Sequence, residues 1–261
     1  MLGAIVGDMI GSAYEFAPIK IKDFSLFSSD SRFTDDTVLT VAVAQAILNK
    51  GEYLSSVREF GKAYPDAGYG YKFFEWLESH NPEPYNSWGN GSAMRVSPVG
   101  LAFDTIEDVL REASRSAEIS HNHSEGIKGA QATALSVFLA RTTVNKETIK
   151  KEITERFDYD LDRSLDDIRP GYDFDVSCQG SVPESIICFL EAESFEDTVR
   201  NAVSLGGDAD TMACIAGSIA EAYYGGIDTE IVKNVARRLP KEFWKVVQAF
   251  YERYGNNLQQ H

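Results

Sequence analysis

The sequence contains few cysteines, and they do not form pairs. Only three occur in 261 residues, at Cys178, Cys188 and Cys214. An odd number without paired spacing argues against a disulfide framework, and the apolar or small neighbours of Cys178 and Cys188 indicate buried thiols. We therefore expect a reducing cytoplasm as the compartment of this protein.

Basic residues are also scarce, with 25 against 40 acidic ones, which gives a formal net charge of −15. This charge repels phosphate backbones and anionic lipid heads, so we expect no nucleic-acid backbone binding and no membrane binding, whereas divalent cations are attracted. No apolar run approaches the length of a membrane span. The N-terminal stretch 1–8 has no basic lead and carries a carboxylate, so it makes a poor signal peptide.

Strand signals are weak, because no long alternating run occurs and no Asn-Gly turn is flanked by β-branched stretches. Helical patterns dominate instead, and the chain is long enough for one substantial core. They cover residues 35–49, 53–63, 71–79, 105–119, 124–140, 183–192, 195–204, 211–224, 228–238 and 240–254. Longer irregular stretches are expected at 17–33, 80–100 and 158–182, the third being a solvated acidic loop. The sequence thus predicts an all-α protein in which residues 1–261 form a single domain.

Two short clusters near opposite ends of the chain combine carboxylates with threonine. One is Phe-Thr-Asp-Asp-Thr at 33–37, the other Gly-Gly-Asp-Ala-Asp-Thr at 206–211, and each opens into an apolar, Ala-rich helix. Taken alone, each is an ordinary helix start, with Thr34 as a plausible N-cap and acids in the first turn. However, such apolar helices should begin in the core, where unpaired carboxylates are costly. Carboxylate and hydroxyl oxygens suit Mg²⁺, Mn²⁺ or Ca²⁺, so two clusters that meet would form a dinuclear metal site.

The second cluster also resembles the nucleophile motif of haloacid-dehalogenase-type phosphatases, Asp-x-Asp-Thr. That motif lies at the C-terminal end of a hydrophobic β-strand near the N-terminus of an α/β domain. Here Asp208, Asp210 and Thr211 lie close to the C-terminus and no parallel-strand pattern precedes them. We therefore reject a phosphatase of this type.

The N-terminal segment places Gly7, Gly11 and Glu15 at intervals of four, hence on one face of a helix. Two glycines on one face make room for a neighbouring helix or a ligand. Glu15 is then either a solvated side chain at a helix end or a general acid/base at the lip of a site.

A further stretch, residues 84–95, is rich in Gly, Asn and Ser, and its backbone N–H groups could cradle a phosphate or diphosphate. His121 and His123 stand two apart, which is poor zinc spacing on a helix, and no cysteine assists them. We therefore expect no zinc site there.

Taken in order, these motifs resemble the ADP-ribosylglycohydrolase family, which includes dinitrogenase reductase-activating glycohydrolase. The matches run from residue 3 to about residue 225, and although each motif is weak alone, the ordered set is specific. They are Gly7-Asp8-x-x-Gly11-x-x-x-Glu15, Thr34-Asp35-Asp36-Thr37, Gly89-Asn90-Gly91-Ser92-Ala93-Met94-Arg95, Ser120-His121 with Gly129-Ala130, and Gly206-Gly207-Asp208-x-Asp210-Thr211.

The resemblance implies an orthogonal bundle of many helices with a centre of two divalent cations, Mg²⁺ or Mn²⁺. It implies six metal ligands, namely Thr34, Asp35, Asp36, Asp208, Asp210 and Thr211. Glu15 and Asp35 are the implied catalytic residues. The implied substrate-binding residues are Asp66 on a cleft loop, Gly91, Ser92, Ala93 and Met94 in a loop holding the diphosphate, and His121 lining the ADP-ribose cleft.

The function implied is that of a hydrolase that cleaves the glycosidic bond between ADP-ribose and an acceptor side chain. Its partner would be an ADP-ribosylated protein or a small ADP-ribose conjugate. The alternative is a catalytically inactive relative that binds ADP-ribose or has a structural role. The presence of all six implied ligands and of Glu15 favours the enzyme.

Overall fold

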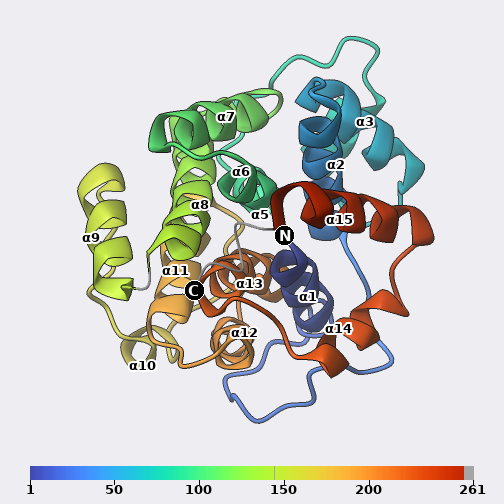
Figure 1. The fold of residues 1–261 in the computed structure, drawn as a ribbon. Helices are drawn as coiled ribbons and strands as arrows, with labels where there is room; N and C mark the ends of the chain where they lie inside the picture. The colour runs from blue at the N-terminus through green and yellow to red at the C-terminus, as the bar shows by residue number, and fades with distance from the viewer. Residues whose placement is uncertain (144, 256–261) are drawn as a thin grey trace.

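A computed structural model describes residues 1–143 and 145–255, and all regular elements in these ranges are helices (Figure 1). An isolated antiparallel bridge joins Gly89 to Ser177. The helices are α1 (Leu2–Gly11), α2 (Asp35–Asn49), α3 (Tyr53–Ala63), α4 (Tyr71–Glu78), α5 (Gly91–Met94), α6 (Ser97–Ala102), α7 (Ile106–Glu118), α8 (Ser124–Thr142), α9 (Lys146–Phe157), α10 (Leu165–Ile168), α11 (Cys178–Leu190), α12 (Phe195–Ser204), α13 (Ala209–Tyr224), α14 (Thr229–Ala236) and α15 (Lys241–Tyr254). The prediction of an all-α protein is confirmed.

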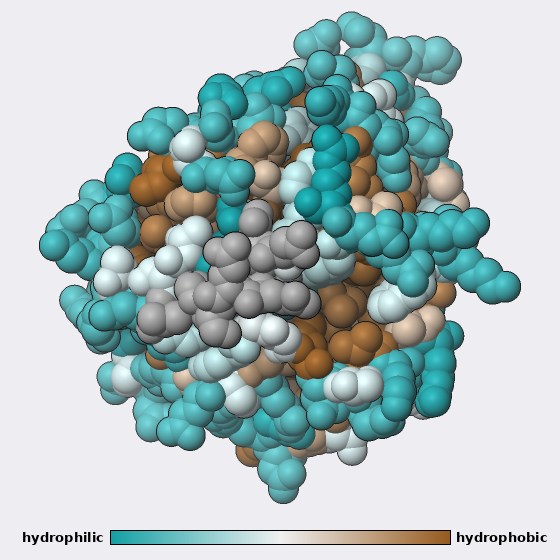
Figure 2. Space-filling model, in the orientation of Figure 1, coloured by the Kyte–Doolittle hydropathy of each residue, from teal (hydrophilic) through white to brown (hydrophobic). Residues whose placement is uncertain are grey.

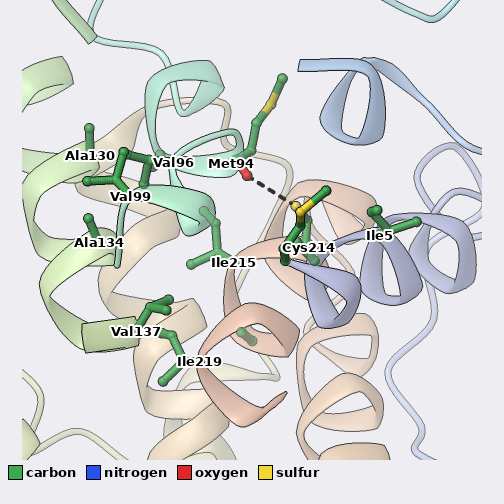
Figure 3. Close-up of a cluster of buried hydrophobic side chains, with 14 of the residues drawn as sticks. Ile5, Met94, Val96, Val99, Ala130, Ala134, Val137, Cys214, Ile215 and Ile219 are labelled. Carbon is green, nitrogen blue, oxygen red and sulfur yellow. Dashed lines mark hydrogen bonds between the residues drawn. The ribbon is translucent and has the colours of Figure 1, made fainter. Parts of the chain in front are cut away.

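Helix α13 lies in the middle of the molecule, with α1, α5, α8, α11 and α12 around it (Figure 1). Its residues from Ala209 to Ala222 are all buried, because nearly every position carries an apolar or small side chain. Figure 3 shows part of this core, in which Ile215 and Ile219 of α13 lie near Val99 of α6 and Val137 of α8. A helix that is apolar on all sides needs neighbours on all sides.

Helices α1 and α13 pack closely and antiparallel through small residues spaced four apart. A Cβ atom added to Gly7 would lie 2.0 Å from the carbonyl oxygen of Ala213, and one added to Gly11 would lie 2.3 Å from that of Ala209. Glycine is therefore required at these two positions of α1. This confirms the interpretation that the N-terminal glycines make room for a neighbouring helix, and the contact brings the end of α1 to the start of α13.

The sequence predictions at 80–100 and 158–182 were partly wrong. The first stretch contains α5 and α6, the second contains α10 and the first turns of α11, and α9 was not predicted at all. Side-chain caps explain part of the difference, because Asn145 accepts a hydrogen bond from the N–H of Glu147 (2.9 Å) and Ser164 accepts one from that of Asp167 (3.2 Å). Tertiary packing stabilises such short helices, which periodicity alone does not reveal.

The three cysteines are free and buried, as the sequence predicted. In the view of Figure 2, hydrophilic side chains occupy most of the periphery of the molecule, and apolar ones appear mainly between them. Among residues 1–143 and 145–255, no helix combines the length and the apolar character that crossing a bilayer requires.

Candidate active site and metal centre

Six carboxylates gather where three helix ends meet. They come from α1 and the turn after it (Asp8 and Glu15), from the start of α2 (Asp35 and Asp36) and from the start of α13 (Asp208 and Asp210). We refer to these six residues as the acid cluster. Asp8, Asp36, Asp208 and Asp210 are buried, whereas Glu15 and Asp35 keep part of their surface exposed. The expectation that the acid-bearing helix starts lie in the core is confirmed.

Asp8 is the fully buried carboxylate that positions the start of α2. It accepts hydrogen bonds from the N–H of Thr34 (3.0 Å), the hydroxyl of Thr34 (2.8 Å) and the N–H of Thr37 (3.1 Å), and also from the hydroxyl of Thr37. A carboxylate with several donors is held in one orientation. Asp8 therefore ties α1 to the first turn of α2, which carries Asp35 and Asp36.

Two side-chain hydrogen bonds connect the start of α13 with the rest of the site. The hydroxyl of Thr211 donates to Oδ2 of Asp36 (3.2 Å), which joins the two acid-threonine clusters directly. The amide nitrogen of Asn90, just before α5, donates to Oδ2 of Asp208 (2.7 Å). The fold thus brings together the two clusters that lie about 170 residues apart in the sequence.

The capping roles of the two clusters differ. Thr34 is the N-cap of α2, as predicted, and its hydroxyl oxygen accepts a hydrogen bond from the N–H of Asp36 (3.3 Å). Asp208 holds the corresponding position of α13, but its side chain makes no capping hydrogen bond. It turns to Asn90 instead, so the second cluster is more than a helix cap.

The donor set fits a divalent cation. One carboxylate oxygen from each of Glu15, Asp208 and Asp210 lies within 4.8 Å of the others. In addition, Oδ1 of Asp36 and Oδ1 of Asp210 are buried without a hydrogen-bond partner. Buried, unpaired carboxylate oxygens are costly, and a hard cation bound by oxygen ligands removes that cost.

The electrostatics of the acid cluster are those of crowded like charges. Burial, followed by the charge of Asp210, raises the pKa of Asp8 to about 7 and that of Glu15 to about 7. The same two causes, in the same order, raise the pKa values of Asp35, Asp36 and Asp208 well above their usual range. In the metal-free protein several of these carboxyls therefore hold protons near neutral pH, which a bound cation would displace.

The residues predicted to hold the diphosphate, Gly91 to Met94, do not form the expected loop. Their role in binding the diphosphate stays a prediction. These residues form the helical turn α5, and Ser92, Ala93 and Met94 are buried. The hydroxyl of Ser92 donates to the carbonyl oxygen of Gly126 (2.7 Å), and Met94 packs into the core, where its carbonyl oxygen accepts a hydrogen bond from Cys214 (Figure 3). The prediction of a loop was wrong because tertiary packing, and not composition, decides this turn. Of its four residues, only Gly91 is partly exposed.

The remaining predicted residues lie beside the acid cluster rather than in it. Asp66 is exposed on a turn whose Ala67 carbonyl accepts a hydrogen bond from the N–H of Asp35 (2.9 Å). His121 is buried next to the Gly89–Gly91 turn, since a Cβ atom added to Gly91 would lie 3.1 Å from its Nε2. Both residues therefore border the site, each from a separate loop.

Comparisons with known proteins identify the family of this chain. A family model described as ADP-ribosylglycohydrolase matches residues 1–259. The chain belongs to the ADP-ribosylglycohydrolase family. A solved structure titled "ADP-ribosylglycohydrolase-related protein complex" shares its fold, with a TM-score of 0.72, 24% sequence identity and coverage of 97% of this chain and 95% of that one.

Curated relatives carry the names of ADP-ribosylhydrolases. The ADP-ribosylhydrolase ARH3 of Homo sapiens is 30% identical over 86% of this chain and 84% of its own length. The ARH3 of Gallus gallus is 28% identical over 99% of this chain and 93% of its own. The ADP-ribosylarginine hydrolase Tri1 of Pseudomonas putida is 24% identical over 97% of this chain and 77% of its own. Membership of the family supports a hydrolase that acts on ADP-ribosylated substrates.

Sequence reasoning missed two residues of this ADP-ribosylglycohydrolase-family site. Asp8 and Asn90 appeared only as members of glycine-containing motifs, without a role of their own. The signal for Asp8 was a single acid in the middle of an otherwise apolar helix, which is costly unless its oxygens are satisfied. Nothing local marked Asn90, because its partner Asp208 lies 118 residues away.

Proposed function

We propose that this protein is a metal-dependent hydrolase that cleaves the glycosidic bond between ADP-ribose and an acceptor side chain. The observation that carries this proposal is the meeting of the two acid-threonine clusters, with unpartnered carboxylate oxygens on Asp36 and Asp210, in a chain of the ADP-ribosylglycohydrolase family. The substrate is an ADP-ribosylated protein or a small ADP-ribose conjugate.

The metal ligands that we propose are oxygens from both clusters. They are those of Thr34, Asp35, Asp36, Asp208, Asp210 and Thr211. Two divalent cations, Mg²⁺ or Mn²⁺, would supply Lewis acidity that fixes the ribose and polarises a water when they are bound. Asp8 is not one of the proposed ligands, because its oxygens already accept hydrogen bonds from α2. Its role is to hold the first turn of α2 in place.

Glu15 is the residue that we propose for proton transfer. Its side chain is partly exposed, and burial together with the charge of Asp210 raises its pKa to about 7. A carboxyl with a pKa near the working pH both holds and releases a proton readily. Cleavage at the anomeric carbon develops oxocarbenium character, so a proton must reach the leaving group or leave the attacking water.

Asp35 is the second proposed catalytic carboxylate. It is partly exposed, and a Cβ atom added to Gly68 would lie 3.6 Å from its Oδ1, so the turn that carries Asp66 covers it. The backbone of that turn also fixes the N–H of Asp35. We propose that Asp35 orients the ribose or the water.

The test is release of ADP-ribose from arginine-linked and serine-linked substrates, with Mg²⁺ and with EDTA. We expect release that requires the metal and drops at least 100-fold in Asp35→Asn, while Glu107→Gln, an exposed acid in the first turn of α7, keeps full activity. Release of ADP-ribose that persists in EDTA would contradict the metal-dependent mechanism. Tight ADP-ribose binding without release from any linkage would instead favour the inactive, ADP-ribose-binding alternative.

A further inference from the structure

His121 is connected to a buried arginine through one serine hydroxyl. The Nη2 of Arg95 donates to Oγ of Ser120 (3.0 Å), and the same Oγ lies 2.8 Å from Nδ1 of His121. Arg95 and Ser120 are fully buried, and His121 is 4% exposed. The three side chains therefore form a chain of hydrogen bonds that water does not interrupt.

The direction of these hydrogen bonds follows from counting protons. A guanidinium only donates, so the Ser120 oxygen accepts from Arg95. The Ser120 hydroxyl has one proton of its own, and Nδ1 of His121 is its one acceptor among the described residues. If Nδ1 carried a proton, that oxygen would accept twice and its own buried proton would have no partner, which is costly. The Ser120 hydroxyl therefore donates to Nδ1, and the ring proton lies on Nε2.

Arg95 is an unusual residue to find at this place. Its Nε and Nη1 are buried without a partner, and no carboxylate pairs with it within the described part of the chain. A buried charge without a counter-ion is destabilising. Its remaining hydrogen bonds go to the backbone carbonyl oxygen of Ser116 (2.7 Å) and to Ser120. Arg95 is thus better explained by what it does to Ser120 and His121 than by a contribution to stability.

Nε2 of His121 points toward the Gly89–Gly91 turn. Cβ atoms added to Gly91 and Gly89 would lie 3.1 Å and 3.6 Å from this nitrogen, so side chains at either position would cover it. Nε2 has no hydrogen-bond partner among the described residues and is not one of the atoms sealed from solvent. The turn continues into Asn90, whose amide holds Asp208 of the acid cluster. An N–H at Nε2 is therefore presented beside the proposed substrate cleft.

We propose that Arg95 and Ser120 are positioning residues that fix His121 in its Nε2–H tautomer, so that the ring donates a hydrogen bond to an oxygen of bound ADP-ribose. The donation to ADP-ribose rests on the proposed function, whereas the tautomer does not. Burial and the nearby Arg95 charge also lower the pKa of His121, which keeps the ring neutral.

The tautomer is tested by ¹⁵N–¹H spectra of the imidazole rings in the metal-free protein. His121→Gln identifies the signals of His121, and the exposed His80 serves as an internal reference. We expect the proton of His121 on Nε2 in the wild type and a shift toward the Nδ1–H form in Ser120→Ala. Ser116→Ala is the matched control, because it removes a buried hydroxyl from the residue whose carbonyl oxygen accepts from the same guanidinium, and it leaves the hydrogen bonds of Ser120 in place. A wild-type ring protonated at Nδ1, or an unchanged tautomer in Ser120→Ala, overturns the inference.

Binding of ADP-ribose, measured by calorimetry, tests the consequence. We expect Ser120→Ala to bind ADP-ribose about tenfold more weakly than the wild type, as the loss of one aligned hydrogen bond implies, and Ser116→Ala to bind it as the wild type does. Equal affinity of Ser120→Ala and the wild type overturns the role in binding. If the wild type does not bind ADP-ribose at all, the proposed function fails, while the spectra still decide whether Ser120 sets the tautomer of His121.

Discussion

Replacing Asp210 by asparagine should stabilise the metal-free protein and remove most of the stabilisation that a bound metal gives. The charge of Asp210 acts on every other member of the acid cluster, because it raises the pKa values of all five of them. Its carboxylate oxygen lies within 4.8 Å of oxygens of Glu15 and Asp208. Asparagine keeps the size and one oxygen but removes the charge.

The magnitude follows from these distances. Two unit charges 4.8 Å apart repel by about 3.5 kcal/mol at an effective dielectric constant of about 20. Protonation of the neighbours and the partial exposure of Glu15 relieve part of this repulsion. We therefore expect Asp210→Asn to raise the free energy of unfolding of the metal-free protein by about 2 kcal/mol, which corresponds to an increase in Tm of about 4–8 °C for a chain of this size.

Addition of metal should make the wild type more stable than Asp210→Asn. Mg²⁺ at about 100 times its Kd stabilises the wild type by about 2.7 kcal/mol, whereas the variant lacks a ligand and gains much less. The assay is thermal unfolding at pH 7.5 in EDTA and in a series of Mg²⁺ concentrations. Glu107→Gln removes one charge from the corresponding turn of α7 and should change stability by less than about 0.5 kcal/mol in both conditions. A metal-free Asp210→Asn protein that is less stable than the wild type, or an equal gain from Mg²⁺ in both proteins, would refute the reasoning.

Three further changes test other parts of the structure. Gly7→Ala places a Cβ 2.0 Å from the carbonyl oxygen of Ala213 and should lower the free energy of unfolding by about 1–3 kcal/mol, while Gly70→Ala, with nothing within 4 Å, should not; urea unfolding compares them. Asn90→Ala frees Oδ2 of Asp208 and should weaken metal binding about 10–100-fold in a calorimetric titration; an unchanged affinity contradicts this role. The metal-free protein should lose stability as pH rises from about 4 through about 7, because two carboxyls of the acid cluster have a pKa of about 7 and the folded state therefore binds more protons than the unfolded one. Urea midpoints measured in EDTA that rise over this pH range would contradict this prediction.

The helix starts show how far local sequence can lead. Thr34 caps α2 as predicted, and its acids lie at the start of a buried helix, because capping and apolar periodicity are properties of a few consecutive residues. The same reasoning failed at Gly91–Met94, where turn-forming residues were taken for a loop. The helical turn there depends on the hydrogen bond from Ser92 to Gly126 and on burial against α8, which come from a segment 34 residues away.

Asp8 and Asn90 show the same limit within the site. Each acts on a residue distant in sequence, Asp8 on Thr34 and Asn90 on Asp208. The sequence alone assigned them no role, because carboxylates and amides often occur in helices and turns without any function in a site. Their roles follow only from the orientation that their helices adopt.

The sequence by itself determined the helical class, the capping of α2, the burial of the acid-bearing helix starts and, through the order of five weak motifs, the family. These properties depend on side-chain chemistry within one or two turns or on the order of motifs along the chain. Only the tertiary structure decided that the two clusters meet, that Asp8 and Asn90 hold them and that Arg95 reaches His121 through Ser120. The physical reason is the contact of α1 with α13. Small residues four apart permit a close approach, but they do not specify which helix approaches, and it is that choice of partner that brings the carboxylates together.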